Sequence, residues 1–364
     1  MPYIISPEAA PQAGRETELA TSPAEVPRSW GPTGLIVLAA LLGIASLSSA
    51  FAAPNVPKEG WNVADMPSQR GRIYLVTGGT SGIGYETAKA LAASGGQVII
   101  AATNPERGKQ AIESIGKETP NADVKFEALD LADLASVRAL AERLTAALPR
   151  LDGLINNAGI MEPPTREISA NGFEKQFAVN YLGHFALTAQ MLPLLRKSTA
   201  PRVITVSSIA ARGGTIHFDD LQFEKEYDSF AAYQQSKLAC LMFALELQRR
   251  SDAAGFNIRS IASHPGVSRT NLLVVRGGIN GFVRRNLPFL FQPADRGALP
   301  TLYAATAQDA HGGTYYGPTS LAETRGEVGL AKIPPAAADA EVAARLWTLS
   351  EKLSAIEFPT RASN

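Results

Sequence analysis

The strongest constraint on the fold of this chain is a regular alternation of short apolar runs with segments of helical periodicity. Parallel strands need a crossover, usually a helix, to bring the chain back, so this alternation predicts a parallel sheet. The runs with the character of buried strands are Ile73–Thr77, Gln97–Ala101, Val124–Leu129, Gly153–Asn156, Arg202–Ser207 and Asn257–His264. Helical periodicity lies between them, as in Glu86–Ala93 and Leu134–Ala147. With a further strand at Gly313–Tyr316 and a late helix at Ala337–Leu353, the pattern predicts a doubly wound α/β sheet of about seven strands with helices on both faces.

A glycine-rich turn stands at the end of the first predicted strand, where residues 77–84 read Thr-Gly-Gly-Thr-Ser-Gly-Ile-Gly and a helical segment follows. Glycines at Gly78, Gly82 and Gly84 would let the backbone turn sharply and approach an anion closely. The helix N-terminus adds free N–H groups and the positive end of its dipole. A glycine-rich turn alone is weak evidence, but a strand before it and a helix after it are the context of a nucleotide site. The turn therefore predicts a Rossmann-type fold that holds a pyrophosphate.

The N-terminal part of the chain differs from the rest in composition. Residues 1–33 are rich in Pro, Ala, Ser and Glu with little apolar periodicity, which predicts a disordered segment. Residues 34–53 contain no charged side chain, and about 20 apolar residues are what a bilayer core requires, so a membrane helix is the leading interpretation. The alternative is a cleaved signal for export or an organelle, because small residues such as Ala50, Ala52 and Ala53 close the segment. Residues 54–71 would form a linker.

Charge and cysteine content exclude several classes of protein. Lys plus Arg equals Asp plus Glu at 34 each, so no broad positive field points to nucleic-acid binding. The single cysteine, Cys240, excludes an internal disulfide, and its apolar setting predicts a buried, inert thiol. The few histidines form no cluster with metal-ligand spacing, so no metal site is predicted. His184 and His264 are expected to be packed and hydrogen-bonded rather than catalytic.

Further motifs follow the glycine-rich turn in a fixed order. They are Asp130-Leu131, Asn156-Asn157-Ala158-Gly159, Asn180 in V-N-Y-L-G-H-F, Ser207-Ser208, Tyr233-x-x-x-Lys237, and Pro265-Gly266 with Thr270. With these motifs, the chain resembles the short-chain dehydrogenase/reductase family over roughly Gly60 to Ser354. It is most similar to the retinol-dehydrogenase-like branch, because a long insert before Tyr233 contains F-D-D-L at Phe218–Leu221 and because of the segment Gly312–Pro318. The resemblance implies one catalytic domain over residues 72–356, followed by a tail at 357–364.

The resemblance implies a nicotinamide-dependent oxidoreductase that interconverts a carbonyl and an alcohol. Tyr233 and Lys237 are four residues apart in a helical stretch and so share one face. A free tyrosine ionises only near pH ~10, so positive charge from Lys237 and the oxidised nicotinamide would be needed to stabilise the phenolate. Tyr233 would then exchange a proton with the substrate oxygen, Ser208 would hydrogen-bond that oxygen, and Asn180 would hold a water that links Lys237 to solvent.

The end of the second predicted strand bears on cofactor choice. An NAD site normally places an acidic residue there, whereas an NADP site needs positive charge for the extra phosphate. The sequence has Thr103 and Asn104 instead of an acid, with Arg107 nearby, so NADP is predicted over NAD. Relatives often carry arginine where Thr103 stands, so Thr103 and Arg107 are predicted at the cofactor from their own chemistry. The family pattern places the following residues there: Gly78, Thr80, Ser81, Gly82, Ile83, Gly84, Asp130, Leu131, Asn157, Ala158, Gly159, Tyr233, Lys237, Pro265, Gly266 and Thr270.

The segment Asn271–Phe291 follows the sixth predicted strand, where this family covers its substrate. Its many apolar side chains predict a pocket for a lipophilic carbonyl or alcohol, such as a retinoid, steroid or long-chain aldehyde. The alternative is that these residues only pack the cover against the domain. Arg15 and Arg28 precede the apolar segment 34–53 and three basic residues follow it, so a retained anchor would leave the catalytic domain on the cytosolic side.

Two other classes of function remain open from the sequence. A non-catalytic nucleotide-binding or scaffold protein could use the same fold, although such proteins usually lose the tyrosine or the lysine. An NAD-dependent dehydrogenase, or an isomerase, epimerase or dehalogenase on the same scaffold, is also compatible with the motifs. The expected partner is a small carbonyl or alcohol, no nucleic acid is expected, and a homo-oligomer is possible.

Overall fold

The computed structural model describes residues 60–268 and 292–359. Its centre is a sheet of eight strands in the order β3-β2-β1-β4-β5-β6-β7-β8. The strands are β1 (Ile73–Thr77), β2 (Gln97–Ala102), β3 (Val124–Ala128), β4 (Gly153–Asn156), β5 (Arg202–Val206), β6 (Arg259–Ser263), β7 (Tyr315–Ser320) and β8 (Arg325–Leu330). The first seven pair in parallel, and β8 pairs with β7 antiparallel. The predicted doubly wound parallel sheet is confirmed.

The eighth strand is the one element of the sheet that the sequence prediction missed. Arg325, Gly326 and Glu327 are exposed, and only the later part of β8 is buried, so the strand lacks a continuous apolar run. A short hairpin joins β8 to β7, so β8 forms the edge of the sheet. An edge strand needs no buried pattern on both faces. The predicted strand at Gly313–Tyr316 is shifted in the structure to Tyr315–Ser320.

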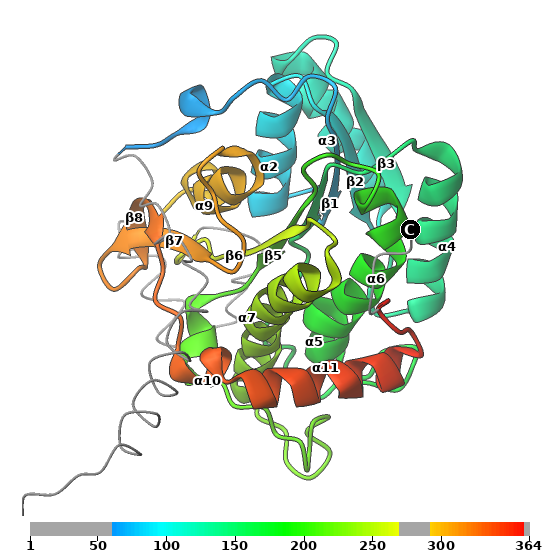
Figure 1. Cartoon of the computed structure of the whole chain (residues 1–364), viewed down its shortest axis with the longest axis vertical. Coiled ribbons are helices and arrows are strands. Elements are labelled where there is room, and N and C mark those ends of the chain that lie inside the picture. Colours follow the sequence, from blue (N-terminus) through cyan, green and yellow to red (C-terminus); the bar gives the residue numbers. More distant parts are fainter. Residues whose placement is uncertain (1–59, 269–291, 360–364) are drawn as a thin grey trace, which may run out of the picture. The chain divides into compact units, whose positions relative to one another are not determined.

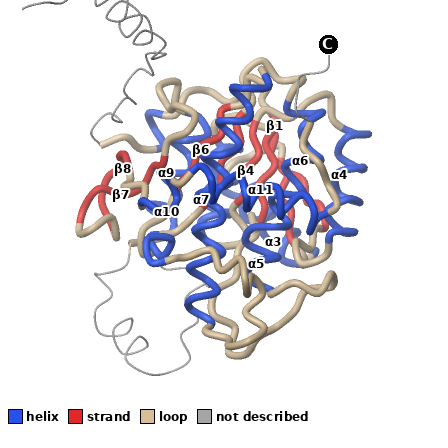
Figure 2. The backbone as a smooth tube through the Cα atoms, turned by 60° about the horizontal axis from the view of Figure 1, so that its bottom comes forward, coloured by secondary structure: helices blue, strands red, loops and turns tan. Residues whose placement is uncertain are grey.

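Helices cover both faces of the sheet (Figures 1 and 2). One face carries α2 (Gly82–Ala93), α3 (Pro105–Glu118) and α9 (Ala294–Thr306). The other carries α4 (Leu134–Ala147), α6 (Gly183–Leu195) and α7 (Ser229–Ala254). The helices α10 (Pro335–Ala338) and α11 (Ala340–Ser354) lie against α7 on this second face. Each face of the sheet has its own buried apolar cluster, because both faces of a parallel sheet must be covered.

An aromatic cluster holds α11 onto the second face. The ring of Trp347 stacks on Phe243 of α7 with centroids 5.7 Å apart and meets Phe185 of α6 edge-on at 5.1 Å. Phe358, which follows α11, packs against the same rings. Such pairs add about 0.5–1.5 kcal/mol each beyond the area that they bury. The C-terminal helix is therefore part of the core that positions α7.

Residues that precede β1 pack onto the first face. Trp61 is 6% exposed and meets the ring of Tyr303 in α9 edge-on, with centroids 5.2 Å apart. A single 3-10 turn, η1 (Val63–Asp65), follows with Asn62 as its capping residue. Within residues 60–268 and 292–359, no helix is both long and apolar enough to cross a bilayer. The apolar segment 34–53, predicted as an anchor or signal, lies outside this range.

Candidate active site

The glycine-rich turn between β1 and α2 forms a cradle at the edge where the parallel strands end. Gly78 has φ +68°, and a Cβ there would lie 2.9 Å from Ala158 Cα. A Cβ on Gly84 would lie 2.4 Å from the carbonyl oxygen of Gly78, so neither position has room for a side chain. Ser81 caps α2 without a side-chain hydrogen bond to it. The N–H groups of the first helical turn are therefore available to an anion, as the sequence predicted for a pyrophosphate.

The cradle lies between β1 and β4, where the order of the strands reverses, and this is where open α/β sheets bind ligands. Thr77, the last residue of β1, fastens the loop after β4. Its Oγ1 accepts from the backbone N–H groups of Asn157 at 2.9 Å and Ala158 at 3.0 Å, and its carbonyl accepts from Asn157 Nδ2 at 2.8 Å. Thr77 opens the glycine-rich motif but was not among the predicted site residues.

His184 of α6 connects this cradle to Asn180. Its Nε2 lies 2.8 Å from Thr77 Oγ1, and its Nδ1 lies 2.8 Å from the carbonyl oxygen of Asn180. A carbonyl only accepts, so Nδ1 carries the proton and Nε2 accepts from the Thr77 hydroxyl. Burial lowers the pKa of His184 to about 4, which keeps the ring neutral. The expectation that this histidine is packed and hydrogen-bonded agrees with its surroundings.

Asn180 lies on η2 (Ala178–Leu182), a single π-helical turn between α5 (Lys175–Phe177) and α6. π-turns of this kind often occur at functional sites because they re-aim a side chain. The amide of Asn180 accepts from Ile160 N at 2.8 Å and donates to Ile160 O at 3.0 Å and Ser236 Oγ at 2.9 Å. Its carbonyl accepts from His184 and from the weak S–H donor of Cys240 at 3.1 Å. The side chain of Asn180 therefore clamps the loop after β4 onto α7.

Cys240 is 1% exposed, and burial raises the pKa of its thiol. The predicted buried thiol is confirmed by this setting.

Tyr233 and Lys237 lie one turn apart on α7 and are 4% and 3% exposed. Lys237 Nζ lies 6.0 Å from the centroid of the Tyr233 ring and donates to the carbonyl of Val206, at the end of β5, at 3.1 Å. A Cβ on Gly159 would lie 3.4 Å from this ammonium group, so the loop after β4 passes close to it. The phenol and the ammonium group thus lie beside each other at the ends of the central strands.

Ser207 and Ser208 follow β5 but differ in their contacts. Ser207 is buried, and its hydroxyl donates to the carbonyl of Lys237 at 2.7 Å. Ser208 caps the short 3-10 helix η3 (Ile209–Gly213), and its Oγ accepts from Ala210 N at 3.1 Å. Accepting this bond leaves the hydroxyl proton of Ser208 able to donate to another oxygen. Of the two serines, Ser207 is buried with its proton used by Lys237 O, whereas Ser208 is partly exposed.

The remaining predicted cofactor residues lie at the ends of β2, β3 and β6. Thr103 and Arg107 are exposed beside β2, and the side chain of Asn104 is used to cap α3 by accepting from Arg107 N at 2.9 Å. Asp130 is exposed after β3 and accepts from Ala132 N at 2.8 Å. Thr80, Gly82 and Ile83 belong to the cradle itself, and Pro265 and Gly266 follow β6. Leu131 follows Asp130 and is buried in the core of the second face, against Gly183 of α6. Thr270 lies outside the described residues.

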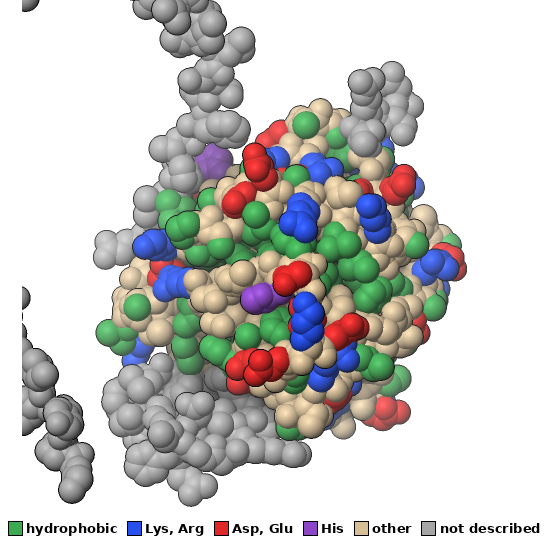
Figure 3. Space-filling model, turned by 90° about the horizontal axis from the view of Figure 1, so that it is seen from below, with side chains coloured by type: hydrophobic (Ala, Val, Ile, Leu, Met, Phe, Trp, Pro, Cys, Tyr) green, Lys and Arg blue, Asp and Glu red, His purple; other side chains and the backbone are tan. Residues whose placement is uncertain are grey.

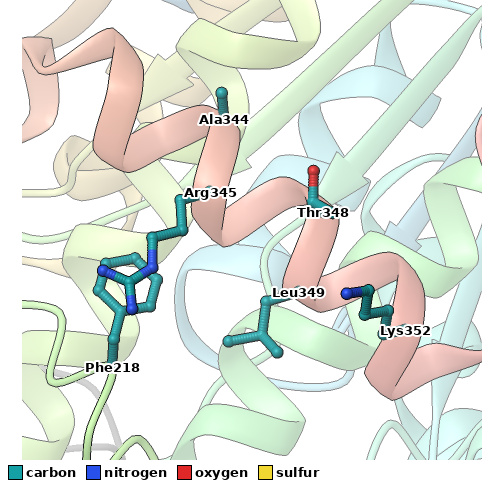
Figure 4. Close-up of a pocket in the computed structure, with 6 residues that line it drawn as sticks. All are labelled: Phe218, Ala344, Arg345, Thr348, Leu349 and Lys352. Carbon is teal, nitrogen blue, oxygen red and sulfur yellow. The ribbon is translucent and has the colours of Figure 1, made fainter.

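The described part of the chain contains no cluster of His, Cys, Asp or Glu that could hold a metal ion. A groove of about 550 Å³ lies on α11, away from the residues above. Figure 4 shows that the guanidinium of Arg345 lies over the ring of Phe218, at 3.8 Å from its centroid. The groove is lined by Phe218, Ala344, Arg345, Thr348, Leu349 and Lys352. Seen from below in Figure 3, basic and acidic side chains are interspersed over this side of the molecule.

The site combines a dinucleotide cradle, placed where the strand order reverses, with a buried tyrosine–lysine pair. This combination defines a nicotinamide-dependent oxidoreductase of the Rossmann type. A family model described as short chain dehydrogenase matches residues 72–276. The chain belongs to this family, whose members bind NAD(P).

Relatives with assigned activities share much of the chain. Mouse retinol dehydrogenase 13 is 41% identical over 78% of this chain and 84% of its own length. Mouse polyprenol dehydrogenase is 40% identical over 79% of this chain and 85% of its own length. These names support the resemblance to the retinol-dehydrogenase-like branch, and the protein is an oxidoreductase.

Solved structures agree with the fold. An uncharacterized protein from Mycobacterium paratuberculosis has a TM-score of 0.70 and 41% identity, covering 82% of this chain and 99% of its own. A short chain dehydrogenase from Shigella flexneri in complex with NADP has a TM-score of 0.53 and 25% identity, covering 69% of this chain and 98% of its own. The catalytic unit is thus a single domain with the family's usual architecture.

Proposed function

We propose that this oxidoreductase interconverts a carbonyl and an alcohol, with Tyr233 as the general acid and base. The nicotinamide cofactor, when bound, supplies or accepts the hydride. In the reducing direction Tyr233 gives its proton to the carbonyl oxygen, and in the oxidising direction the phenolate removes the proton from the alcohol. The observation that supports this most is the pairing of Tyr233 with Lys237 on one buried face of α7.

Two further residues support the proton transfer in this proposal. The Lys237 ammonium stabilises negative charge on the phenol when the proton has left. The free proton of Ser208 donates to the substrate oxygen as charge develops there, and removal of one such donor costs about 10²–10³ in kcat. Both side-chain N–H groups of Asn180 donate, to Ile160 O and Ser236 Oγ, while Oδ1 accepts from Ile160 N and keeps a lone pair for the water that would link Lys237 to solvent.

Replacement of one oxygen atom tests this assignment. Tyr233→Phe keeps the aromatic ring at this position of α7 and should bind NADPH as tightly as the wild type. The rate of carbonyl reduction should fall by a factor of about 10²–10⁴. Tyr227→Phe is a matched control, since Tyr227 lies in the insert before α7 and its hydroxyl contacts Gln176 and Glu174 at the start of α5. Wild-type turnover by Tyr233→Phe on any carbonyl substrate would reject Tyr233 as the acid.

We further propose NADP as the preferred cofactor. Thr103 and Arg107 are exposed at the end of β2, no carboxylate follows that strand before Glu106, and Arg107 can approach a 2′-phosphate. The related structure from Shigella flexneri in complex with NADP supports this choice. Initial rates with NADPH and NADH at equal concentration test it, and a strong preference for NADH would reject it.

For the substrate we propose a lipophilic carbonyl or alcohol. Two observations support this proposal. Residues 271–291 are rich in apolar side chains, and two relatives are named as dehydrogenases of retinol and of polyprenol. The same class of substrate fits a membrane location, with residues 34–53 as an anchor and the catalytic domain on the cytosolic side. Carbonate extraction of membranes tests the anchor: release of the full-length chain would reject it, and a mature form that begins near Ala52 would establish cleavage instead.

A further inference from the structure

The hairpin of β7 and β8 carries a loop in an uncommon conformation next to the active site. Leu321, Ala322 and Glu323 are consecutive and all left-handed, with φ values of +47°, +55° and +66°. Residues with a side chain rarely adopt this conformation, and it persists only where surrounding contacts fix it. Contacts with the rest of the domain must therefore hold this loop.

The side chain of Glu323 makes those contacts. It is only 16% exposed, and its Oε2 lies 3.0 Å from His264 Nε2 and forms an ion pair with Arg212. Its Oε1 accepts from Lys332 N at 3.1 Å. Arg212 also donates to the carbonyl of Ala322 at 3.2 Å. One carboxylate thus ties three separate segments together.

The ring of His264 links Glu323 to the loop after β6. Its Nδ1 accepts from Gly266 N at 3.2 Å, so the neutral ring carries its proton on Nε2 and donates it to Glu323. Burial lowers the pKa of His264, in agreement with a neutral ring. The hairpin holds the same loop through its backbone, since Val267 N donates to the carbonyl of Thr324 at 2.8 Å.

Two of the three segments that Glu323 joins adjoin residues predicted for the reacting end of a bound cofactor. Arg212 lies in η3, which begins directly after Ser208. Pro265 and Gly266 follow β6, the neighbour of β5. A dinucleotide with its pyrophosphate at α2 must extend across the ends of β4, β5 and β6 for its ring to reach Tyr233. In that arrangement the Ser208 turn and the loop after β6 would flank the ring.

We propose that Glu323 is a positioning residue. Through His264 it holds the loop at 265–267, and through Arg212 it holds the turn after Ser208. The distance between these two segments is then the one that the nicotinamide ring and the substrate oxygen need. This inference rests on the proposed function. It predicts that Glu323 affects the nicotinamide end of the cofactor and not the adenosine end, which lies across the sheet beside β2.

Two variants and one control separate this role from a structural one. Glu323→Ala removes the contacts with His264, Arg212 and Lys332, whereas Glu323→Gln keeps an acceptor for His264 and loses the charge toward Arg212. Glu327→Gln is the control, because Glu327 is exposed in the same hairpin and its carboxylate accepts from Gly60 N. For each, the thermal midpoint, kcat, and the dissociation constants of NADPH and of 2′-phospho-ADP-ribose are measured.

Glu323→Ala should bind 2′-phospho-ADP-ribose as the wild type does, bind NADPH more weakly, and lose between about tenfold and 100-fold in kcat, as a misplaced reacting group does. Glu323→Gln should have an NADPH affinity and a kcat between those of Glu323→Ala and the wild type. Glu327→Gln should match the wild type in both. If Glu323→Ala does not fold, Glu323→Gln and Arg212→Lys carry the same comparison.

Wild-type kcat and NADPH affinity in the Glu323 variants would overturn the inference. Equal weakening of both ligands with a lower thermal midpoint would also overturn it, since that is the result of a structural role alone. A wild-type chain that binds NADPH but reduces no carbonyl would count against the proposed function only, because the comparison of the two ligands needs no turnover. A wild-type chain that binds no dinucleotide would overturn both.

Discussion

The Nε2 atom of His184 lies 2.8 Å from the Oγ1 atom of Thr77, and this contact joins α6 to the last residue of β1. Thr77 holds the loop after β4, and His184 holds the carbonyl of Asn180. The contact requires a neutral ring, because Thr77 Oγ1 already accepts from two backbone N–H groups and has no room for an Nε2–H donor. Protonation of His184 would therefore strain both the cofactor cradle and the π-turn.

This leads to a prediction about acid stability. The pKa of His184 is lowered to about 4 by burial, whereas an unfolded histidine titrates near ~6.5. Between these values the unfolded chain binds more protons, so the free energy of unfolding falls as the pH falls, by up to about 3 kcal/mol for this residue. His184→Gln, measured by urea unfolding between pH 7 and pH 4, should lose less stability on acidification than the wild type.

Two histidines serve as comparisons in this experiment. His311→Gln removes a half-buried histidine outside the site and measures the general effect of losing an imidazole. His264 shares the direction of the pKa shift, so the wild type retains part of its pH dependence in either single variant. An unfolding free energy that falls equally in His184→Gln and the wild type would show that His184 does not contribute.

A second prediction concerns Gly84. A Cβ there would lie 2.4 Å both from the carbonyl oxygen of Gly78 and from Asn157 Nδ2, so Gly84→Ala forces the cradle open. We expect a loss of about 1–3 kcal/mol in stability and weaker NADPH binding. Gly116→Ala is the matched control: the position is exposed in α3 with nothing within 4 Å of the added atom, and the change should stabilise that helix by about 0.5–1 kcal/mol. NADPH binding by Gly84→Ala as tight as that of the wild type would argue against a role of this glycine-rich turn in cofactor binding.

Much of this architecture could be predicted because it is local in the sequence. β1, β4 and α4 begin and end where periodicity and turn residues predicted. Each apolar run became a strand, but β3, at the edge of the sheet, is only partly buried, unlike the buried strand that its sequence predicted. The β8 edge could not be predicted because its exposed first half lacks an apolar run, and the Glu323 contacts could not because they join residues far apart in the chain. Glu323 is 59 residues from His264, and no pattern near either one indicates the other. The Thr77–His184 contact spans 107 residues and was missed for the same reason.

A third prediction tests the cofactor preference at one side chain. If Arg107 contacts the 2′-phosphate, Arg107→Ala removes a charge-assisted hydrogen bond of about 1.5–3 kcal/mol, which corresponds to a tenfold or larger rise in the KM for NADPH. The KM for NADH should stay unchanged, because that cofactor lacks the phosphate. Lys109→Ala is the control, since Lys109 is exposed on the same helix. Equal changes with both cofactors would remove Arg107 from the phosphate site.

The last prediction concerns the length of the substrate. An apolar pocket gains about 0.8 kcal/mol for each CH₂ group that it buries, which corresponds to about a fourfold rise in kcat/KM for each added carbon. In a series of straight-chain aldehydes, kcat/KM should therefore climb steadily until the pocket is full and then level off. Tyr233→Phe, measured on the same series, should lower every value by a similar factor, because its role is in proton transfer and not in chain recognition. A flat or falling profile with rising chain length would reject a lipophilic substrate and favour a small, polar carbonyl.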